Sequence, residues 1–467
     1  MTALRKNSDF TGQKPQVAPA RQPRLPRYTS YPTALQFGEL DGRDHMAWLG
    51  DLPAEDPVSL YFHIPFCDQL CWFCGCYTHI SNKYEPVKKY LESLLKELAW
   101  TSSLTGRRKV SHIHFGGGSP TILEAEDFER LMSVVQEAYE ILPGAEIAVE
   151  VDPRTLSRDK VNAYGRCGVN RVSMGIQDFD EKVQKTINRI QSTELIESCL
   201  RWFKTVGIRN INFDLIYGLP NQTEATIRQT VLQTAFYKPS RIALFGYAHV
   251  PWMKKHQALI GAEMLPDQAQ RQAMFDIASR TLVDCGYQAI GLDHFALPGD
   301  TLLDAHDRGT LRRNFQGYTA DNADSLIGFG ASAISSLPGG YAQNTTDMKA
   351  YHQQTGVGES PVVRGVKVTA ADQLVRQLIS DLMCYQQVDP EARAREFGQS
   401  YDFKREYAAL GELLDAGYME VKGSCFRITE AGSPYLRAIC SVFDRYLPAN
   451  FEKNPDILHR CLHESEG

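Results

Sequence analysis

His63-Ile-Pro-Phe-Cys67-Asp-Gln-Leu-Cys71-Trp-Phe-Cys74-Gly-Cys76 is the stretch that organises the rest of this chain, because it gathers four of the eleven cysteines. The spacing of Cys67, Cys71 and Cys74 lets one tight loop hold three corners of a cubane iron–sulfur cluster. The fourth iron then has no protein ligand and can chelate the amino and carboxylate groups of S-adenosylmethionine. An electron passed to the sulfonium would give a 5′-deoxyadenosyl radical. The stretch therefore predicts a [4Fe–4S] cluster and radical chemistry.

A structural zinc site is the alternative interpretation of the same loop, with Cys76 as the fourth ligand. Only Gly75 separates Cys74 from Cys76, whereas structural zinc sites favour two paired knuckles, so the cluster is favoured. The remaining cysteines are scattered, and we expect ordinary side chains there rather than ligands. An odd cysteine count in a long chain also argues against a disulfide framework and favours a reducing compartment.

Composition narrows the class of protein further. A chain of 467 residues with 43% hydrophobic content can bury a globular core in two or three domains. A formal net charge of -6 without a basic block argues against a general nucleic-acid partner. There is no apolar run long enough for a membrane span and no signal-peptide stretch at the start. We expect a soluble, cytoplasmic monomer.

From about residue 57, short β-branched or aromatic segments alternate with stretches of helical period. One helical stretch carries Leu91, Leu94 and Leu98 on a single face. Repeated strand–helix units predict a parallel sheet with right-handed crossovers, and six of them predict an incomplete barrel with an open side. The expected strands are 58–63, 110–115, 146–151, 170–174, 210–215 and 241–246.

The unusual residues lie at or directly after the carboxyl ends of these strands. Carboxyl ends of parallel strands form the catalytic rim of α/β barrels, so we expect these residues to face one mouth. In chain order they are the cysteine loop, Gly116 to Gly118, Glu150 with Asp152, Gln177, Asp214 and Ala248 with its neighbours Tyr247 and His249.

The glycine run at Gly116 to Gly118 lacks the residues of a phosphate-binding loop. It would let the backbone approach the amino acid part of S-adenosylmethionine, although a plain tight turn is the alternative. Glu150 and Asp214 suit ribose hydroxyls or an ammonium group, and Arg189 suits a carboxylate. Alternatively, Glu150 and Asp214 could be ordinary polar residues at strand ends, and Arg189 could be a solvated helix residue.

Three parts are expected along the chain: an N-terminal arm over 1–45, the barrel and its extension over 46–355, and a C-terminal domain over 356–467. The arm carries aromatic residues that predict docking onto the body. Helical stretches at 371–382 and 403–416, a hairpin over 418–429 and a helix from Pro434 indicate a winged-helix-like domain. Its mixed charge favours a lid or scaffold over DNA binding.

Several motifs together carry a family resemblance that runs from about Arg27 to the C-terminal domain. They strongly resemble the oxygen-independent coproporphyrinogen III oxidases of the radical S-adenosylmethionine superfamily. The Cys-x-Cys ending at Cys76 and the last motif are the narrowest features. The motifs are the stretch from Tyr61 to Cys76, Gly116-Gly-Gly-Ser-Pro120, Glu150-Val-Asp-Pro153, Ser173-Met-Gly-Ile-Gln-Asp-Phe179, Asp214-Leu-Ile-Tyr-Gly-Leu-Pro220 and Arg313-Asn-Phe-Gln-Gly-Tyr-Thr319.

The resemblance implies an incomplete (β/α)6 radical barrel with an N-terminal arm and a mostly helical, winged-helix-like C-terminal domain. It also implies the oxidative decarboxylation of coproporphyrinogen III to protoporphyrinogen IX in haem biosynthesis. A porphyrinogen with four carboxylates needs local cations, for which Arg27, Arg312 and Arg313 are candidates. An electron donor and an electron acceptor are needed too, and the sequence identifies neither.

The resemblance further implies two molecules of S-adenosylmethionine, with only the first on the cluster. Cys76 matches a required cysteine that is not a cluster ligand, and Cys76 and Tyr61 are the candidate catalytic residues. The residues implied for the first molecule are Tyr61, Gly117, Glu150, Ala248 and Ile334. Those implied for the second are Phe73, Gly118, Ser119, Gln177, Arg189 and Asp214.

Four other functions remain open at this point. A haem chaperone of the same superfamily is the nearest, although Cys76 and the pair Phe315 and Gln316 weigh against it. A radical methyltransferase or an anaerobic haem-degrading enzyme would share this core. A DNA-binding regulator that uses the C-terminal domain is the most distant.

Overall fold

The computed structural model describes residues 25–447 of the chain. The first part of the expected arm, residues 1–24, and the expected chain end with Cys461 lie outside the described residues. No helix within 25–447 is both long and apolar enough to cross a bilayer.

Parallel strands form the centre of the molecule, and each of the expected strands is present. They pair in chain order within one sheet, every neighbouring pair being parallel. The strands are β2 (Val58–Ile64), β5 (Lys109–Gly117), β6 (Glu140–Val151), β7 (Arg171–Gln177), β8 (Asn210–Tyr217) and β9 (Arg241–Gly246).

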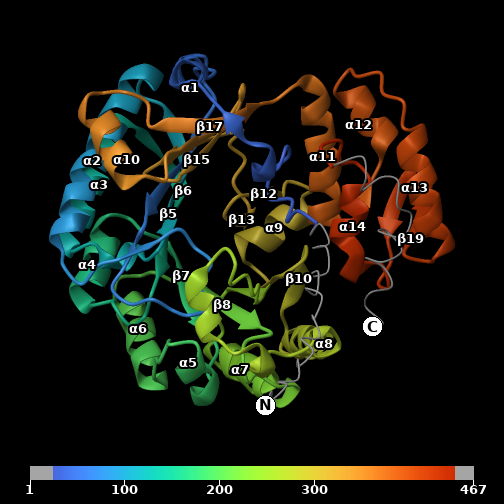
Figure 1. The fold of residues 1–467 in the computed structure, drawn as a ribbon, viewed down its shortest axis with the longest axis horizontal. Coiled ribbons are helices and arrows are strands. Elements are labelled where there is room, and N and C mark those ends of the chain that lie inside the picture. Colours follow the sequence, from blue (N-terminus) through green and yellow to red (C-terminus); the bar gives the residue numbers. More distant parts are fainter. Residues whose placement is uncertain (1–24, 448–467) are drawn as a thin grey trace, which may run out of the picture.

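Helices between successive strands cover the outside of this curved sheet (Figure 1). The expected apolar face of the first one is buried, with Leu91, Leu94 and Leu98 at most 1% exposed. The strand–helix repeat is therefore confirmed. The helices are α2 (Glu85–Thr105), α3 (Ala125–Ala138), α4 (Arg158–Arg166), α5 (Glu181–Thr186), α6 (Thr193–Thr205), α7 (Glu224–Tyr237) and α8 (Gln268–Asp284).

Side chains alternate along the strands between an apolar outer face and a polar inner face. On β2, Phe62 is fully buried and its ring stacks 5.0 Å from Phe115 of β5 and 4.9 Å from Phe329. The adjacent Tyr61 points to the other face, where its ring stacks on His114 of β5. The barrel consequently has an apolar shell and a polar interior.

The sheet continues past both ends of the predicted barrel, which local periodicity did not predict. β14 (Ser325–Phe329) pairs in parallel with β2, and β15 (Ile334–Leu337), β16 (Gly340–Asn344), β17 (Val362–Lys367) and β1 (Gly38–Glu39) follow as antiparallel neighbours. At the other end, β11 (His294–Ala296) and β10 (Gln288–Ile290) pair antiparallel after β9. The sheet thus runs beyond the expected boundary at residue 355, because β17 pairs with both β16 and β1. The helices along these extensions are α1 (Gly42–Gly50), α9 (Thr301–Asp307) and α10 (Met348–Gly356).

A two-stranded hairpin links the two ends of this open sheet. It consists of β12 (Arg312–Asn314) and β13 (Gly317–Thr319). Phe315 at its tip lies 5.6 Å from the ring of Tyr341 on β16, and Tyr318 on β13 lies 5.2 Å from the ring of His294 on β11. The hairpin therefore spans the open side of the barrel.

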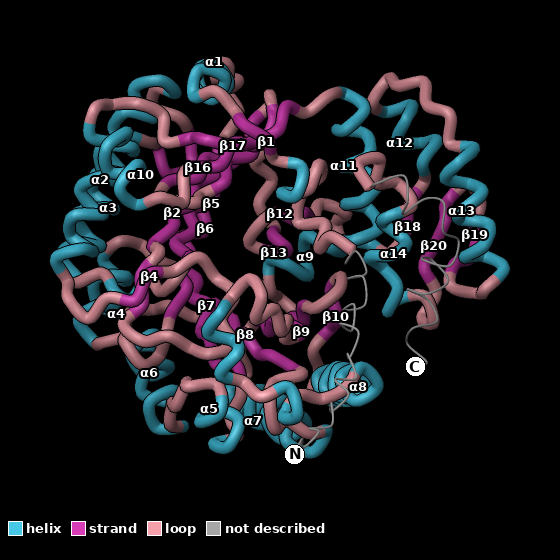
Figure 2. The backbone as a smooth tube through the Cα atoms, viewed as in Figure 1, coloured by secondary structure: helices cyan, strands magenta, loops and turns pink. Residues whose placement is uncertain are grey.

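The C-terminal domain is mostly helical and has its own apolar core. It contains α11 (Ala370–Tyr385), α12 (Pro390–Glu396), α13 (Lys404–Asp415), α14 (Leu436–Ser441) and a small sheet in the order β18 (Gln387–Val388), β20 (Cys425–Ile428), β19 (Met419–Lys422). Figure 2 shows it on the far side of the β12–β13 hairpin from the barrel helices. The expected helices and hairpin are confirmed here.

The aromatic residues before the barrel dock onto this C-terminal domain. Tyr28 and Tyr31 are buried within its core. The Tyr28 hydroxyl donates a hydrogen bond to Asp444 at 3.1 Å, and the Tyr31 hydroxyl accepts one from the Arg445 backbone N–H at 2.9 Å. Docking of the arm, as expected from its aromatic residues, is confirmed for this segment.

Candidate active site

The cysteine loop is fastened to the ends of the first two barrel strands. Its base forms a short parallel pair, β3 (Phe66–Cys67) and β4 (His79–Ile80). The Gly118 N–H donates to the Ile64 carbonyl at 2.9 Å, and the Ser119 N–H donates to the Phe66 carbonyl at 2.8 Å. The loop after β2 is thus tied to the glycine loop after β5.

The underside of the cysteine loop rests on a 3-10 helix, η3 (Lys255–Leu259), which follows β9. His256 contacts the Cys74 carbonyl at 2.8 Å, and Gln257 donates to the Phe73 carbonyl at 2.8 Å. Phe73 itself packs into an apolar cluster with residues of α5 and β8, including Val183 and Ile216. The loop conformation is therefore set by the first and last strands of the predicted barrel together.

The thiols of this loop are surrounded by hydrogen-bond donors. Thr78 donates to the Cys67 sulfur at 3.3 Å, and the Cys76 backbone N–H lies 3.4 Å from the Cys74 sulfur. Cys71 is buried, and Cys76 is exposed. Donors of this kind stabilise thiolates and the sulfurs of an iron–sulfur cluster.

Cys71 contacts two guanidinium groups. Arg154 Nη2 lies 3.2 Å and Arg189 Nη1 lies 3.5 Å from its sulfur. Asp152 holds both arginines, at 2.7 Å from Arg154 Nη2 and 2.9 Å from Arg189 Nη1. Although burial raises its pKa, the two arginines lower the pKa of Asp152 to about 2. The carboxylate at the end of β6 therefore stays charged and directs two cations at one cluster-loop sulfur.

These thiols fit an iron–sulfur cluster by their chemistry and by their presentation on one loop. In residues 25–447, no three Cys, His, Asp or Glu side chains already converge as a metal site. By their spacing, Cys67, Cys71 and Cys74 are the expected ligands; Cys76 lies on the same loop and is the more exposed residue.

The glycine loop is shaped by the side chains that it covers. A Cβ added at Gly116 would come within 2.6 Å of the Glu150 carboxylate, and one at Gly118 within 2.5 Å of Thr78 Oγ1. Gly117 has a φ of +121°, and a Cβ there would meet the His63 ring at 2.9 Å. At each of the three positions, neighbouring atoms of the protein leave no room for a side chain. The loop is more than a plain turn, because it seats the backbone on Glu150 and His63.

Glu150 is the centre of the polar interior. Its carboxylate oxygens are 3.0 Å from His114 Nε2 and 3.1 Å from the Gly117 N–H, which donates to it. Tyr61 stacks on His114, and its hydroxyl is 2.9 Å from Nδ1 of His63. The structure therefore brings the expected residues Tyr61, Gly117 and Glu150 together.

Asp214 lies on β8 across the same interior. It accepts hydrogen bonds from Ser173 at 2.8 Å and from the Asn212 amide at 2.7 Å. Burial raises its pKa to about 7, and the charge of Glu150 acts in the same direction, whereas Arg189 lowers it. Two carboxyl groups and one guanidinium of the expected set therefore interact electrostatically at one mouth.

The other expected residues are placed as follows. Arg189 is 6% exposed and donates to the Gly175 carbonyl, so the solvated-helix alternative is wrong. Gln177 ends β7 with a φ of +67° beside a register irregularity in its pairing with β8. The Ser119 hydroxyl is buried, 2.5 Å from that of Thr121. Ala248 follows β9, and Ile334 begins β15 outside the predicted strands.

Sequence reasoning missed three residues of this site: His114, Arg154 and Thr78. His114 stands two residues before the glycine run, and period-two polar positions on a strand would have indicated an inward-facing side chain. Arg154 follows the Glu150-Val-Asp-Pro motif directly. Its contact with Cys71, 83 positions away in the sequence, has no local signal.

The candidate substrate cations differ in their environments. Arg312 is bonded to Asp324 at 2.7 Å, and Arg27 is exposed. Arg313 lies 4.6 Å from the ring centre of Tyr318. Its Nε and Nη1 are buried without a hydrogen-bond partner.

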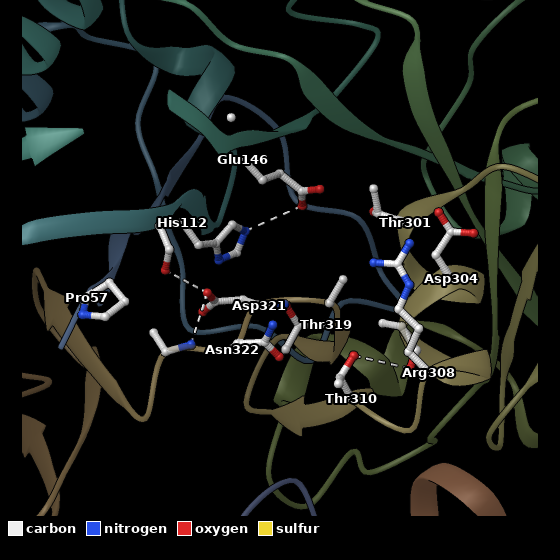
Figure 3. Close-up of a pocket in the computed structure, with 15 residues that line it drawn as sticks. Pro57, His112, Glu146, Thr301, Asp304, Arg308, Thr310, Thr319, Asp321 and Asn322 are labelled. Atoms are coloured by element: carbon white, nitrogen blue, oxygen red, sulfur yellow. Dashed lines mark hydrogen bonds and ion pairs between the residues drawn. The ribbon is translucent and has the colours of Figure 1, made fainter. Parts of the chain in front are cut away.

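A separate cavity of about 360 Å³ lies at the opposite ends of the strands (Figure 3). His112 of β5 and the paired Glu146 of β6 border it, and Asp321 accepts a hydrogen bond from Ser111 at 2.8 Å. The cavity does not include the cysteine loop, although the His112 ring lies 6.0 Å from that of His114.

Comparison with known proteins places the chain in a family. The Radical SAM superfamily matches residues 61–233. An oxygen-independent coproporphyrinogen III oxidase of Bradyrhizobium diazoefficiens is 43% identical over 427 residues, covering 91% of this chain and 95% of the relative. The enzyme of that name from Escherichia coli is 38% identical over 424 residues, covering 90% and 93%.

Solved structures agree with the sequence relatives. The structure of coproporphyrinogen III oxidase from Escherichia coli, described as a radical SAM enzyme, has a TM-score of 0.86 and 37% identity, and covers 90% of this chain and 98% of that one. The expected fold class is thereby confirmed. With this identity over nine-tenths of both partners, the chain belongs to the oxygen-independent coproporphyrinogen III oxidase family of the radical SAM superfamily.

Proposed function

We propose that this protein decarboxylates coproporphyrinogen III oxidatively to protoporphyrinogen IX without oxygen, as a step of haem biosynthesis. One observation carries the proposal. The cysteine loop, with its sulfur-directed donors, closes the same polar mouth that holds Tyr61, Glu150 and Asp214, in a chain whose relatives of this name match nine-tenths of its length. Superfamily membership implies a [4Fe–4S] cluster and S-adenosylmethionine.

The same oxidative decarboxylation takes place on each of two propionate side chains, and its atoms and electrons balance. The propionate β-carbon loses a hydrogen atom, its carboxylate leaves as carbon dioxide, and one electron passes to an external one-electron acceptor, which leaves a vinyl group. The β-carbon C–H bond is not acidic, so polar acid–base chemistry does not remove its hydrogen. The cluster and S-adenosylmethionine, when bound, supply a primary carbon radical that can abstract this hydrogen, after one electron from an external donor.

The residues of this chain position the cysteine loop and supply binding groups at the mouth of the barrel. Asp152 fixes Arg154 and Arg189 against the Cys71 sulfur, so two guanidinium groups point their N–H donors at a sulfur of the cysteine loop. Glu150, fixed by His114 and the Gly117 N–H, presents a carboxylate to an ammonium or hydroxyl group at the mouth. The apolar cluster beneath Phe73 keeps water from the base of the loop.

We propose two molecules of S-adenosylmethionine, held by the residues that the family pattern assigns. The first would contact Tyr61, Gly117, Glu150, Ala248 and Ile334, and the second Phe73, Gly118, Ser119, Gln177, Arg189 and Asp214. The contacts among Tyr61, Gly117 and Glu150 support the first set. Equilibrium dialysis with labelled S-adenosylmethionine should give two molecules per reconstituted chain.

We also propose that the protein acts in the cytoplasm as a monomer, with an arm, a barrel and a C-terminal domain as its working parts. The cysteines of the described residues are all free thiols, which supports a reducing compartment. The C-terminal domain would serve as scaffold or lid, since it contacts the hairpin that spans the open barrel side.

The deciding experiment is turnover under strictly anaerobic conditions. Reconstituted protein with a reductant, S-adenosylmethionine and coproporphyrinogen III should release carbon dioxide and form protoporphyrinogen IX. Tight haem binding without decarboxylation would instead identify a haem chaperone.

Replacing a single cysteine separates the ligands from Cys76. Cys67→Ser, Cys71→Ser and Cys74→Ser should each abolish the cluster absorbance and S-adenosylmethionine cleavage, because each removes one of three iron ligands. Cys76→Ser is the matched control for the loop and should keep the cluster while losing turnover. Normal cleavage in any of the first three variants would disprove the ligand assignment.

A further inference from the structure

Two half-buried guanidinium groups beside the open side of the barrel have unpaired buried N–H groups. Arg313, on the β12–β13 hairpin, has neither Nε nor Nη1 in a hydrogen bond, and Arg376, on α11, has Nη2 without a partner. Gln316 at the hairpin tip likewise leaves its side-chain oxygen unpaired. A buried polar atom without a partner costs stability, and a bound ligand that supplies the missing hydrogen bond is one way to offset that cost.

Both arginines are held in place by aromatic rings rather than by carboxylates. The Arg313 guanidinium is 4.6 Å from the ring centre of Tyr318, and that of Arg376 is 4.8 Å from the ring centre of Tyr341. Arg376 Nε also donates to the Tyr31 carbonyl at 3.1 Å. Within residues 25–447 neither arginine has a carboxylate at ion-pair distance, which contrasts with Arg312 and its partner Asp324. Aromatic rings thus hold both guanidinium groups in place, and neither forms a direct ion pair in this part of the chain.

The β12–β13 hairpin places the Arg313 guanidinium at the open side of the barrel. Phe315 and Arg376 contact the same ring, Tyr341 of β16, so the hairpin tip and α11 meet at one end of the sheet. At the other end, Arg313 interacts electrostatically with Asp293. The Asp293 carbonyl accepts a hydrogen bond from Leu244 in the second half of β9, toward the rim.

We propose that Arg313 and Arg376 bind propionate carboxylates of the substrate, an inference that rests on the proposed function. A planar guanidinium stacked on a tyrosine presents its N–H groups in the fork that a carboxylate accepts. The porphyrinogen has four carboxylates, and two of them survive the reaction. Cations on the hairpin and on α11 would hold the macrocycle between the barrel mouth and the C-terminal domain.

The test is anaerobic calorimetric binding of coproporphyrinogen III and of its uncharged tetramethyl ester to the reconstituted protein. Arg313→Gln and Arg376→Gln should each weaken binding of the tetracarboxylate about tenfold or more. Arg312→Gln, the neighbouring arginine already paired to Asp324, should change it less than about twofold. The ester should bind all four proteins alike. Arg313→Lys keeps the charge without the fork and should fall between the wild type and Arg313→Gln.

Substrate-free cleavage of S-adenosylmethionine and the cluster absorbance report whether a variant is folded, and both should stay at the wild-type level. Equal binding of the tetracarboxylate by the wild type, Arg313→Gln and Arg376→Gln would overturn the inference and leave the proposed function intact. Arginine-dependent binding without any decarboxylation would uphold the carboxylate site and overturn the function. A wild-type protein that does not bind the tetracarboxylate at all would overturn both.

Discussion

At the scale of single residues, Arg154 shows how a neighbour of a motif joins the site. Its guanidinium links Asp152 at the end of β6 to both Gln69 and Cys71 of the cysteine loop. Hydrogen bonds and positive charge at cluster sulfurs favour the reduced, more negative state of the cluster. With Cys71 as a cluster ligand, we expect Arg154 to position the loop and to tune the reduction potential of the cluster.

Removing this guanidinium should make the cluster harder to reduce. Arg154→Met should shift the midpoint potential of the reconstituted cluster to more negative values, by about 59 mV for a tenfold change in a one-electron equilibrium. Potentiometric titration followed by electron paramagnetic resonance measures the shift independently of turnover. Arg166→Met is the control, since Arg166 is 61% exposed and pairs with Glu129 on the surface. An unchanged potential in Arg154→Met would contradict the tuning role.

Gly117 illustrates a residue for which both the backbone and the packing require glycine. Gly117→Ala should lower the free energy of unfolding by about 3 kcal/mol, because a positive φ and contact with the His63 ring act together. Gly144→Ala also has a positive φ, +83°, but its Cβ would meet nothing within 4 Å. That control should cost only about 1 kcal/mol. Urea denaturation compares the two, and equal losses would show that packing against His63 adds nothing.

At the scale of elements, α2 is joined to the sheet extension by a buried carboxylate. Glu97 is 3% exposed and accepts hydrogen bonds from the Gly330 N–H at 2.8 Å, the Asn344 amide at 2.7 Å and the Tyr351 hydroxyl at 2.6 Å. Burial raises its pKa to about 7, against the effect of these three donors. One side chain thus connects α2 with the ends of β14 and β16 and with α10.

This carboxylate should make stability fall as pH rises. The unfolded chain releases the Glu97 proton near pH 4.5, whereas the folded chain keeps it until about pH 7. Between these values the folded state binds more protons, so the free energy of unfolding decreases with pH. Relative to Glu97→Gln, the wild type should lose up to about 3 kcal/mol across this window.

Urea denaturation of the apo-protein at a series of pH values measures the effect. Glu126→Gln, which changes an exposed carboxylate on α3, serves as the control and should follow the wild type. Parallel curves for the wild type and Glu97→Gln would mean that burial does not shift this group.

Helices and strands could be predicted from the sequence wherever apolar residues recur with a regular local period. The barrel strands and helices follow from period two and period 3.6 along the chain, as at Phe62 on β2 and Leu94 on α2. β14 pairs with β2, which lies more than 250 positions earlier in the chain. Its place beside β2 depends on long-range pairing that no local window contains.

At the scale of the whole molecule, Tyr318 couples the C-terminal domain to the barrel. Its hydroxyl donates to the Met383 carbonyl of α11 at 2.7 Å and accepts from the Leu292 N–H at 3.0 Å. The ring also contacts His294 of β11 and carries the Arg313 guanidinium. The hairpin therefore holds the two domains in one arrangement.

Tyr318→Phe should loosen this junction. It leaves the buried Leu292 N–H and the Met383 carbonyl without their partner, at a cost of about 1–3 kcal/mol. Hydrogen exchange of the α11 amides should become faster, while exchange in β5 stays unchanged. Tyr164→Phe is the matched control, because the buried Tyr164 hydroxyl has no hydrogen-bond partner to lose. Identical α11 protection in Tyr318→Phe and the wild type would show that the domains are held by other contacts.

The sequence alone determined the cysteine loop, the parallel barrel strands, the strand-end position of Glu150 and the family, because these depend on spacing and periodicity within short windows. The structure extends β8 to Tyr217, so Asp214 lies within that strand rather than at its end. Only the tertiary structure decided that Arg189 is buried against Cys71, that His114 fixes Glu150 and that the β12–β13 hairpin spans the open side. Hydrogen bonds and ring contacts between segments far apart in the chain set these features. Their geometry exists only once the barrel has closed around its polar interior.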